Sequence, residues 1–97
     1  MGRLFDRVRS LVAEDKYVIG EHAAERLDER GILEWHVVSA LAEGLLLLER
    51  PRSKPHPAVE VEVALPDGTA VKAVWSHLER SGVAKLVTVH FLDEGDI

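Results

Sequence analysis

The chain has 97 residues, 46% of them hydrophobic, a formal net charge of −5 and no cysteine. This length supports one domain with a modest core rather than two, and the lack of thiols excludes disulfides and zinc sites built on cysteine. The acidic balance argues against binding of nucleic acid by bulk charge alone. The charged N-terminal residues and the lack of a long apolar run argue against a signal peptide or a membrane span, so a cytoplasmic location is expected.

The first half of the chain predicts helices. Apolar residues recur at the spacing of an amphipathic helix in three stretches. Gly31, directly after the second stretch, suits a left-handed helix cap. The inward side chains of the third helix are expected to be Trp35, Val38, Leu41 and Ala42. The helices are predicted over residues 3–14, 21–30 and 34–43, with a short extended segment at 17–19.

The second half predicts strands. The apolar run at residues 45–49 is expected to be an interior strand covered on both faces. Residues 50–57 contain three prolines and are expected to form an extended, exposed loop. Alternating apolar residues predict strands over residues 59–65, 70–75 and 85–92. In the last strand Val87, Val89 and Phe91 are expected on one face, with Leu86, Thr88, His90 and Leu92 on the other.

The hairpin after residue 65 has one consistent register. A three-residue loop, Pro66 to Gly68, places Glu62 opposite Lys72 and keeps the buried faces of both strands together, with Gly68 at positive φ. The chain therefore predicts an α+β fold, in which the N-terminal helices pack on one face of a roughly four-stranded, mainly antiparallel sheet. The opposite face should be more polar and carry Glu60, Glu62, Lys72, Thr88 and His90.

The second predicted helix has sorted charges. At 100° per residue, His22, Arg26 and Arg30 fall within a stripe of roughly 80°. We call these three residues the cationic stripe. Its two arginines are one turn apart, a like-charge pair that disfavours an isolated helix by a few tenths of a kcal/mol. A compensating partner is expected, either a carboxylate from elsewhere in the fold or a bound anion such as phosphate.

These residues resemble a known family. His22-Ala23, Arg26 and Glu29-Arg30-Gly31-Ile32, followed by Ala40-Leu41, Gly44 and the strand 86–90, are similar to the small bacterial domains called domain of unknown function 4258. The similarity spans about residues 17–92, with 1–15 as an added helix and 93–97 as an acidic tail of a single domain, residues 1–97. Leu33 departs from the pattern because it stands where a capping Ser or Thr is expected.

The resemblance implies a function. The family is similar in layout to RelE-like toxin nucleases and has been proposed to include metal-independent ribonucleases, so a toxin-type endoribonuclease with no metal or other cofactor is implied. His22 would act as general base or acid toward a ribose 2′-hydroxyl, since imidazole exchanges protons near neutral pH. Arg26 and Arg30 would hold the phosphate and stabilise the charge that develops on it.

Other parts of the chain supply further candidates. Thr88 and His90 share a strand face, where a second proton-transfer group would complete the mechanism. Arg50, Arg52 and Lys54 in the proline-rich loop are candidates for contacts with the phosphate backbone. None of the five histidines forms a pair with the spacing of a recurring metal-ligand motif, so no metal site is predicted.

Other interpretations stay open. The arginines of the stripe also suit structural ion pairs, for example with Glu60 or Glu62. A non-catalytic binding module would use the same stripe to contact an anionic ligand or an acidic partner, and a free sheet edge would support a homodimer. RNA, an antitoxin or another protein are the expected partners, and no membrane partner is expected. Both tryptophans, Trp35 and Trp75, are expected in the core.

Overall fold

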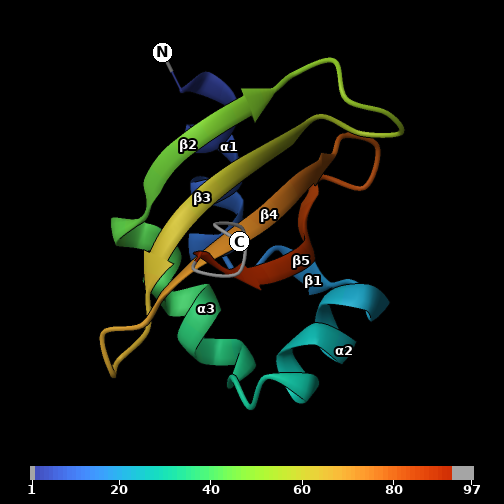
Figure 1. The fold of residues 1–97 in the computed structure, drawn as a ribbon. Helices are drawn as coiled ribbons and strands as arrows, with labels where there is room; N and C mark the ends of the chain where they lie inside the picture. Colours follow the sequence, from blue (N-terminus) through green and yellow to red (C-terminus); the bar gives the residue numbers. More distant parts are fainter. Residues whose placement is uncertain (1, 93–97) are drawn as a thin grey trace.

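The computed structural model describes residues 2–92, and the predicted acidic tail 93–97 lies outside the described residues (Figure 1). Within the described range, the predicted helices form close to their expected positions. No helix there is long and apolar enough to cross a lipid bilayer. The helical elements are α1 (Arg3–Ala13), α2 (Glu21–Glu29), α3 (Glu34–Ala40) and the 3₁₀ turn η1 (Leu41–Glu43). The strands are β1 (Tyr17–Ile19), β2 (Leu45–Arg50), β3 (Ala58–Ala64), β4 (Ala70–Leu78) and β5 (Val83–Phe91).

The sheet confirms the α+β class and corrects the strand number. Over residues 2–92 it has five strands in the order β1-β5-β4-β3-β2, rather than the predicted four. The additional strand is the short extended segment after α1, which pairs in parallel with β5 through Tyr17 and Ala84. The other pairings are antiparallel. The first strand of the chain therefore lies beside the last strand described, a pairing that no local pattern indicates.

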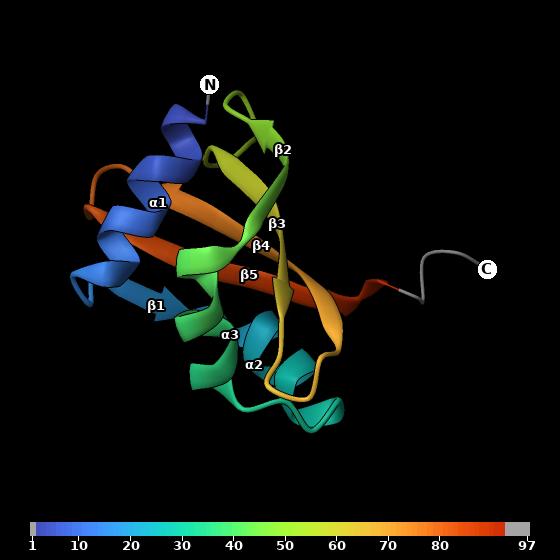
Figure 2. The same cartoon turned by 90° about the vertical axis from the view of Figure 1, so that its left-hand side faces the viewer.

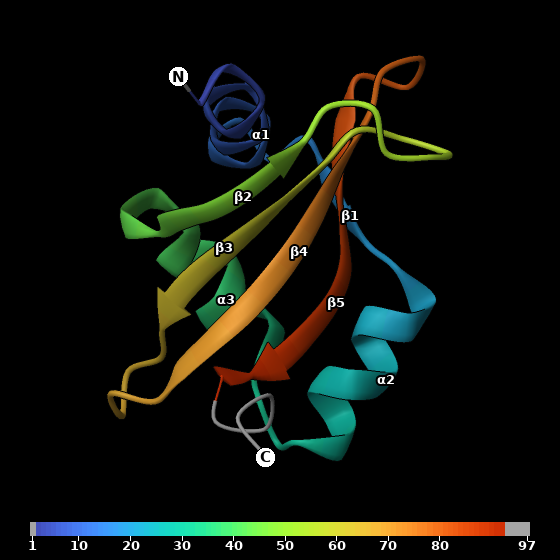
Figure 3. The ribbon, with the colours of Figure 1, turned by 45° about the horizontal axis from the view of Figure 1, so that its top comes forward.

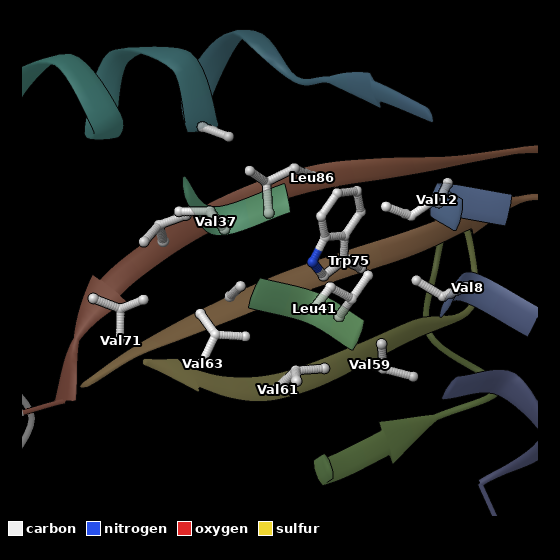
Figure 4. Packing of buried hydrophobic residues seen from close by; sticks show 14 of the residues in the cluster. Val8, Val12, Val37, Leu41, Val59, Val61, Val63, Val71, Trp75 and Leu86 are labelled. Atoms are coloured by element: carbon white, nitrogen blue, oxygen red, sulfur yellow. The ribbon is translucent and has the colours of Figure 1, made fainter. Parts of the chain in front are cut away.

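The helices pack on one face of the sheet, as predicted (Figure 2). All of them contribute to one hydrophobic core, in which Trp75 of β4 is fully buried between side chains such as Leu41 and Leu86 (Figure 4). The opposite face of the sheet has no helix over it among the described elements (Figure 3). The strand registers place the predicted polar residues on this open face, including Glu60, Lys72 and Thr88.

The inward face of α3 differs from the prediction. Val37 and Leu41 are buried, whereas Trp35 is 66% exposed and Ala42 is also exposed. Val38 is half-buried against the core. Trp35 lies two residues, about 200° of helical rotation, from the buried Val37, so the face that buries Val37 exposes Trp35. The helix then tightens into η1 at Leu41, which changes the rotation of the residues that follow, including Ala42. The expectation that Trp35 lies in the core is wrong, and the same expectation for Trp75 is confirmed.

The predicted interior strand is an edge strand instead. β2 pairs only with β3 among the described strands, and it leaves Leu45, Leu47 and Leu48 exposed. Its register shifts between Leu46 and Leu48, so the strand bends beside β3. A short apolar run has the same pattern at the edge and in the middle of a sheet. The following segment 51–57 is a loop, as predicted.

The predicted hairpin register is correct. Glu62 lies opposite Lys72, and the loop contains Gly68 at φ 89°. The backbone N–H of Thr69 donates a hydrogen bond of 2.9 Å to the Asp67 carboxylate. This bond lowers the pKa of Asp67 below its ordinary value of 3.8 because it favours the ionised carboxylate.

A β-bulge changes the faces of β5. Val74 lies opposite Thr88, but Trp75 lies opposite Leu86, so Val87 is the extra residue on β5. Leu86 and Val89 consequently face the same core, and both are buried. The prediction that Leu86 and Val89 lie on opposite faces is therefore wrong. Thr88 and His90 do share the open face, because they follow the bulge.

Candidate functional site

The helix α2 is fixed to the sheet at its start. The Gly20 N–H donates a 2.9 Å hydrogen bond to the Leu86 carbonyl, which attaches the first turn of α2 to β5. Ala23 and Leu27 then bury one face of the helix, and α2 lies along the side of β5 (Figure 3). His22 lies on the exposed surface of α2, whereas Arg26 and Arg30 are half-buried.

The end of α2 has the predicted cap. Gly31 adopts φ 64°, a left-handed conformation that glycine reaches at little cost. The Ile32 N–H then donates to the Leu27 carbonyl at 2.9 Å, and the chain turns into α3. Leu33 begins α3 without a side-chain cap, as its identity implies. The turn between α2 and α3 therefore holds Arg30 close to the start of α3.

His22 and Arg26 are in direct contact on the surface of α2. The Arg26 Nε donates to His22 Nε2 at 3.5 Å, a long hydrogen bond. The same guanidinium contacts the Glu29 carboxylate at 3.4 Å. His22 is exposed and Arg26 is half-buried. Glu29, from the same helix, is thus one carboxylate that compensates the like-charged arginines, and the imidazole lies beside a positive charge.

Arg30 extends the stripe to β5. Its guanidinium carbon lies 5.0 Å from the centre of the Phe91 ring, which is a cation–π distance. Phe91 packs against the hydrophobic core at the end of β5. The ring restricts where the guanidinium can lie, so Arg30 is a positioned cation rather than a freely rotating one.

A cavity adjoins Arg30. Its volume is about 330 Å³, and it lies among the α2–α3 turn, the β3–β4 loop and the end of β5. Trp35 does not line this cavity, but its ring centre lies 5.7 Å from the ring centre of His36, which does. The lining includes Arg30, His36, Leu65, Asp67, Thr69 and Phe91.

The other predicted proton-transfer candidates lie elsewhere. Thr88 and His90 are on the open face of β5, opposite Val74 and Lys72, whereas the helices pack on the other face. The Thr88 hydroxyl is buried and has no hydrogen-bond partner among residues 2–92. The structure therefore places His22 in contact with Arg26 on α2 and Arg30 directly after that helix, over Phe91. It does not add Thr88 or His90 to that group.

The predicted phosphate contacts in the proline-rich loop are also separate from the stripe. Arg50 forms an ion pair with Glu60 on the open face, where Lys72 approaches the same carboxylate at 3.4 Å. Arg52 and Lys54 lie in the loop between β2 and β3. This loop joins the start of β3, whereas the cavity adjoins the loop at the end of β3 (Figure 1).

Sequence reasoning did not include His36, Trp35 or Phe91 in the site. Phe91 was predicted only as part of an apolar strand face, and Trp35 was predicted in the core. Their proximity depends on the angle between α2 and α3 and on the β3–β4 loop, which are tertiary features. Among residues 2–92, no group of three or more His, Cys, Asp or Glu side chains is placed to hold a metal ion.

The chain matches the model of a protein family. The family described as Domain of unknown function (DUF4258) matches residues 19–91, which is most of the chain. The match contains α2 with the cationic stripe and the elements around the cavity, and it leaves α1 outside. No curated protein and no solved structure matches the chain.

Proposed function

We propose that this chain, which belongs to the DUF4258 family, is a small metal-independent ribonuclease. Its reactive centre is the cationic stripe. Support comes from the chemistry of the stripe, because the family description states no activity. RNA is the substrate class because its ribose 2′-hydroxyl supplies an internal nucleophile, and the protein then needs only a base and cations at the phosphate.

The contact between Arg26 and His22 carries this proposal. The Arg26 Nε lies 3.5 Å from His22 Nε2, the nitrogen that would accept a proton from the RNA. A neutral imidazole beside a guanidinium is the pair that cleavage requires: one group accepts a proton, and the other attracts the phosphate. Both side chains reach the surface, so an extended RNA strand has access to them.

The reaction assigns a role to each residue. A phosphate oxygen of the RNA replaces His22 Nε2 as the acceptor of the hydrogen bond from Arg26. His22 Nε2 is then free to accept the proton of the 2′-hydroxyl. The 2′-oxygen bonds to phosphorus, the bond to the 5′-oxygen breaks, and the leaving oxygen takes a proton from the imidazolium or from water. Arg26 and Arg30 stabilise the extra negative charge of the transition state. The products have 2′,3′-cyclic phosphate and 5′-hydroxyl ends.

The test is cleavage of mixed-sequence single-stranded RNA in EDTA. We expect fragments with cyclic phosphate ends from the native protein and at least a 100-fold slower reaction from His22→Ala. The matched control is His77→Ala, because His77 lies on β4 and not on α2. Equal rates for the native protein and His22→Ala would contradict the proposal.

The second candidate is a binding module without catalysis. It is favoured by the fact that stripe cations already have partners in the protein: Arg26 contacts Glu29, and Arg30 lies over Phe91. Such positioned guanidiniums suit recognition of a phosphate or carboxylate. Binding of RNA in EDTA with no cleavage at any time would favour this candidate over the ribonuclease.

A further inference from the structure

The cavity beside Arg30 has the size and the walls of a site for a flat, partly polar group. Its volume of about 330 Å³ is at the lower end of the range for small-molecule pockets, roughly 300–1,000 Å³. Leu65 and Phe91 supply apolar surface, and the Arg30 guanidinium lies over the Phe91 ring. A planar heteroaromatic ring stacks on both kinds of surface.

Trp35 adds an exposed aromatic surface next to the cavity. Its side chain is 66% exposed, although tryptophan is usually among the more buried residues. It projects from the first turn of α3 and lies against His36, which lines the cavity. An exposed indole beside a cavity is typical of proteins that stack the bases of single strands, where each stacked base contributes about 1–3 kcal/mol.

The polar groups indicate which edge of a ring would be recognised. Asp67 is ionised at neutral pH, since Thr69 lowers its pKa, and a carboxylate only accepts hydrogen bonds. It lines the same cavity as Phe91 and Leu65. A base with an exocyclic amino group would donate to this carboxylate. Uracil offers only its N3–H, which lies between two carbonyl oxygens that repel a carboxylate.

We propose that this cavity binds one nucleobase of single-stranded RNA, with a preference for the amino-bearing bases over uracil, and that Trp35 stacks the neighbouring base. This inference rests on the proposed function, because it assigns a base subsite to the same RNA strand. Arg30 lines the cavity and is also the last residue of the stripe. A strand seated here passes from the cavity along α2 toward Arg26 and His22.

Binding is measured separately from cleavage, with 2′-O-methyl tetranucleotides that lack the nucleophile. Oligo-C and oligo-U are titrated while tryptophan fluorescence is followed, because Trp35 is exposed and Trp75 is fully buried. We expect oligo-C to quench the fluorescence and to bind at least fivefold more tightly than oligo-U. Cytidine 5′-monophosphate, tested in parallel, should bind more weakly than oligo-C, which distinguishes an RNA strand from a free nucleotide as ligand.

Exposed variants test the pocket without disturbing the core. We expect Trp35→Ala to raise the Kd for oligo-C about tenfold, measured by amide chemical shifts. Asp67→Asn should remove the preference for oligo-C over oligo-U. Leu48→Ser, at an exposed position on the edge strand β2, is the control and should change neither value.

The outcomes distinguish the two proposals. Binding that is absent, or that is unchanged in Trp35→Ala and Asp67→Asn, overturns the base subsite, even if the native protein cleaves RNA. Binding with these variant effects, together with no cleavage of ordinary RNA, supports the subsite and contradicts the ribonuclease. Binding of oligo-C should persist in His22→Ala, because His22 is outside the cavity.

Discussion

The two faces of the sheet bury different kinds of side chain. On the covered face, Val59, Val61 and Trp75 are fully buried against the helices. On the open face, the same strands carry Glu60, which is mostly buried between Arg50 and Lys72. One face excludes water with apolar side chains, and the other covers a carboxylate with two cations. Burial alone therefore does not identify the hydrophobic core of this molecule.

The difference predicts where the stability lies. Apolar burial gives a net gain in proportion to the area removed from water. An ion pair must first overcome the loss of hydration of both charges, and its net contribution is smaller. Substitutions on the covered face should therefore destabilise the protein more than substitutions on the open face.

The largest effect is expected for Trp75→Ala. The substitution leaves a large cavity among Leu41, Leu86 and their neighbours, and the free energy of unfolding should fall by about 3–5 kcal/mol. Denaturant unfolding followed by circular dichroism measures it. Trp75→Phe should cost clearly less, because it keeps an aromatic ring and removes an indole N–H that is buried without a partner among residues 2–92. Equal losses would contradict the cavity explanation.

Glu60→Ala tests the open face. It removes the carboxylate that Arg50 and Lys72 share, and we expect a loss of about 1–2 kcal/mol, since Arg50 keeps access to water. Glu62→Ala is the matched control two residues along the same face, because among the described residues Glu60, and not Glu62, pairs with Arg50 and Lys72. A loss as large as that of Trp75→Ala would show that the two faces are energetically equivalent.

A smaller, pH-dependent effect is expected at Asp67, in the loop that joins the two central strands. Its pKa is lowered in the folded state by the hydrogen bond from Thr69. Its contribution to stability is therefore fully present above its ordinary pKa of 3.8 and is lost as the pH falls through the lowered value. Asp67→Asn should weaken the decline in melting temperature at acidic pH. An unchanged acid profile would contradict this assignment.

The smallest effect is expected at the exposed edge. Leu48→Ser should change the free energy of unfolding by less than about 0.5 kcal/mol, because Leu48 is 48% exposed on an edge strand. Thermal unfolding at matched protein concentrations measures it. A clear stabilisation or destabilisation would show that the β2 leucines contact something in solution, such as a second copy of the chain.

Much of the fold could be predicted because its signals are local. The left-handed cap at Gly31 and the register around Gly68 follow from the few residues on either side of each glycine. The bulge at Val87 was not predicted, since Leu86 and Val87 are both apolar and the alternation of residues 87–91 was extended through them in a single phase. The edge position of β2 could not be predicted either, because an apolar run has the same sequence pattern in an edge strand and in an interior strand.

The candidate site also has one part that the sequence predicts, the cationic stripe, and one part that it does not, the cavity. Helical periodicity was enough to group His22, Arg26 and Arg30, because they occupy one helix. The cavity requires Arg30 from the turn after α2, Asp67 from a hairpin loop and Phe91 from β5 to meet, which depends on tertiary packing. The exposure of Trp35 likewise depends on how α3 rotates above the sheet, and the sequence pattern placed it in the core.

The parallel pairing of β1 with β5 has a consequence for synthesis of the chain. During translation, β1 and α2 emerge long before the strand against which both of them pack. Until β5 leaves the ribosome, Ala23 and Leu27 have no strand to cover them, and the apolar face of α2 stays open to water. Contacts between such distant parts of a chain form slowly. Productive folding of this protein is therefore expected to follow synthesis of β5 rather than accompany the synthesis of its helices.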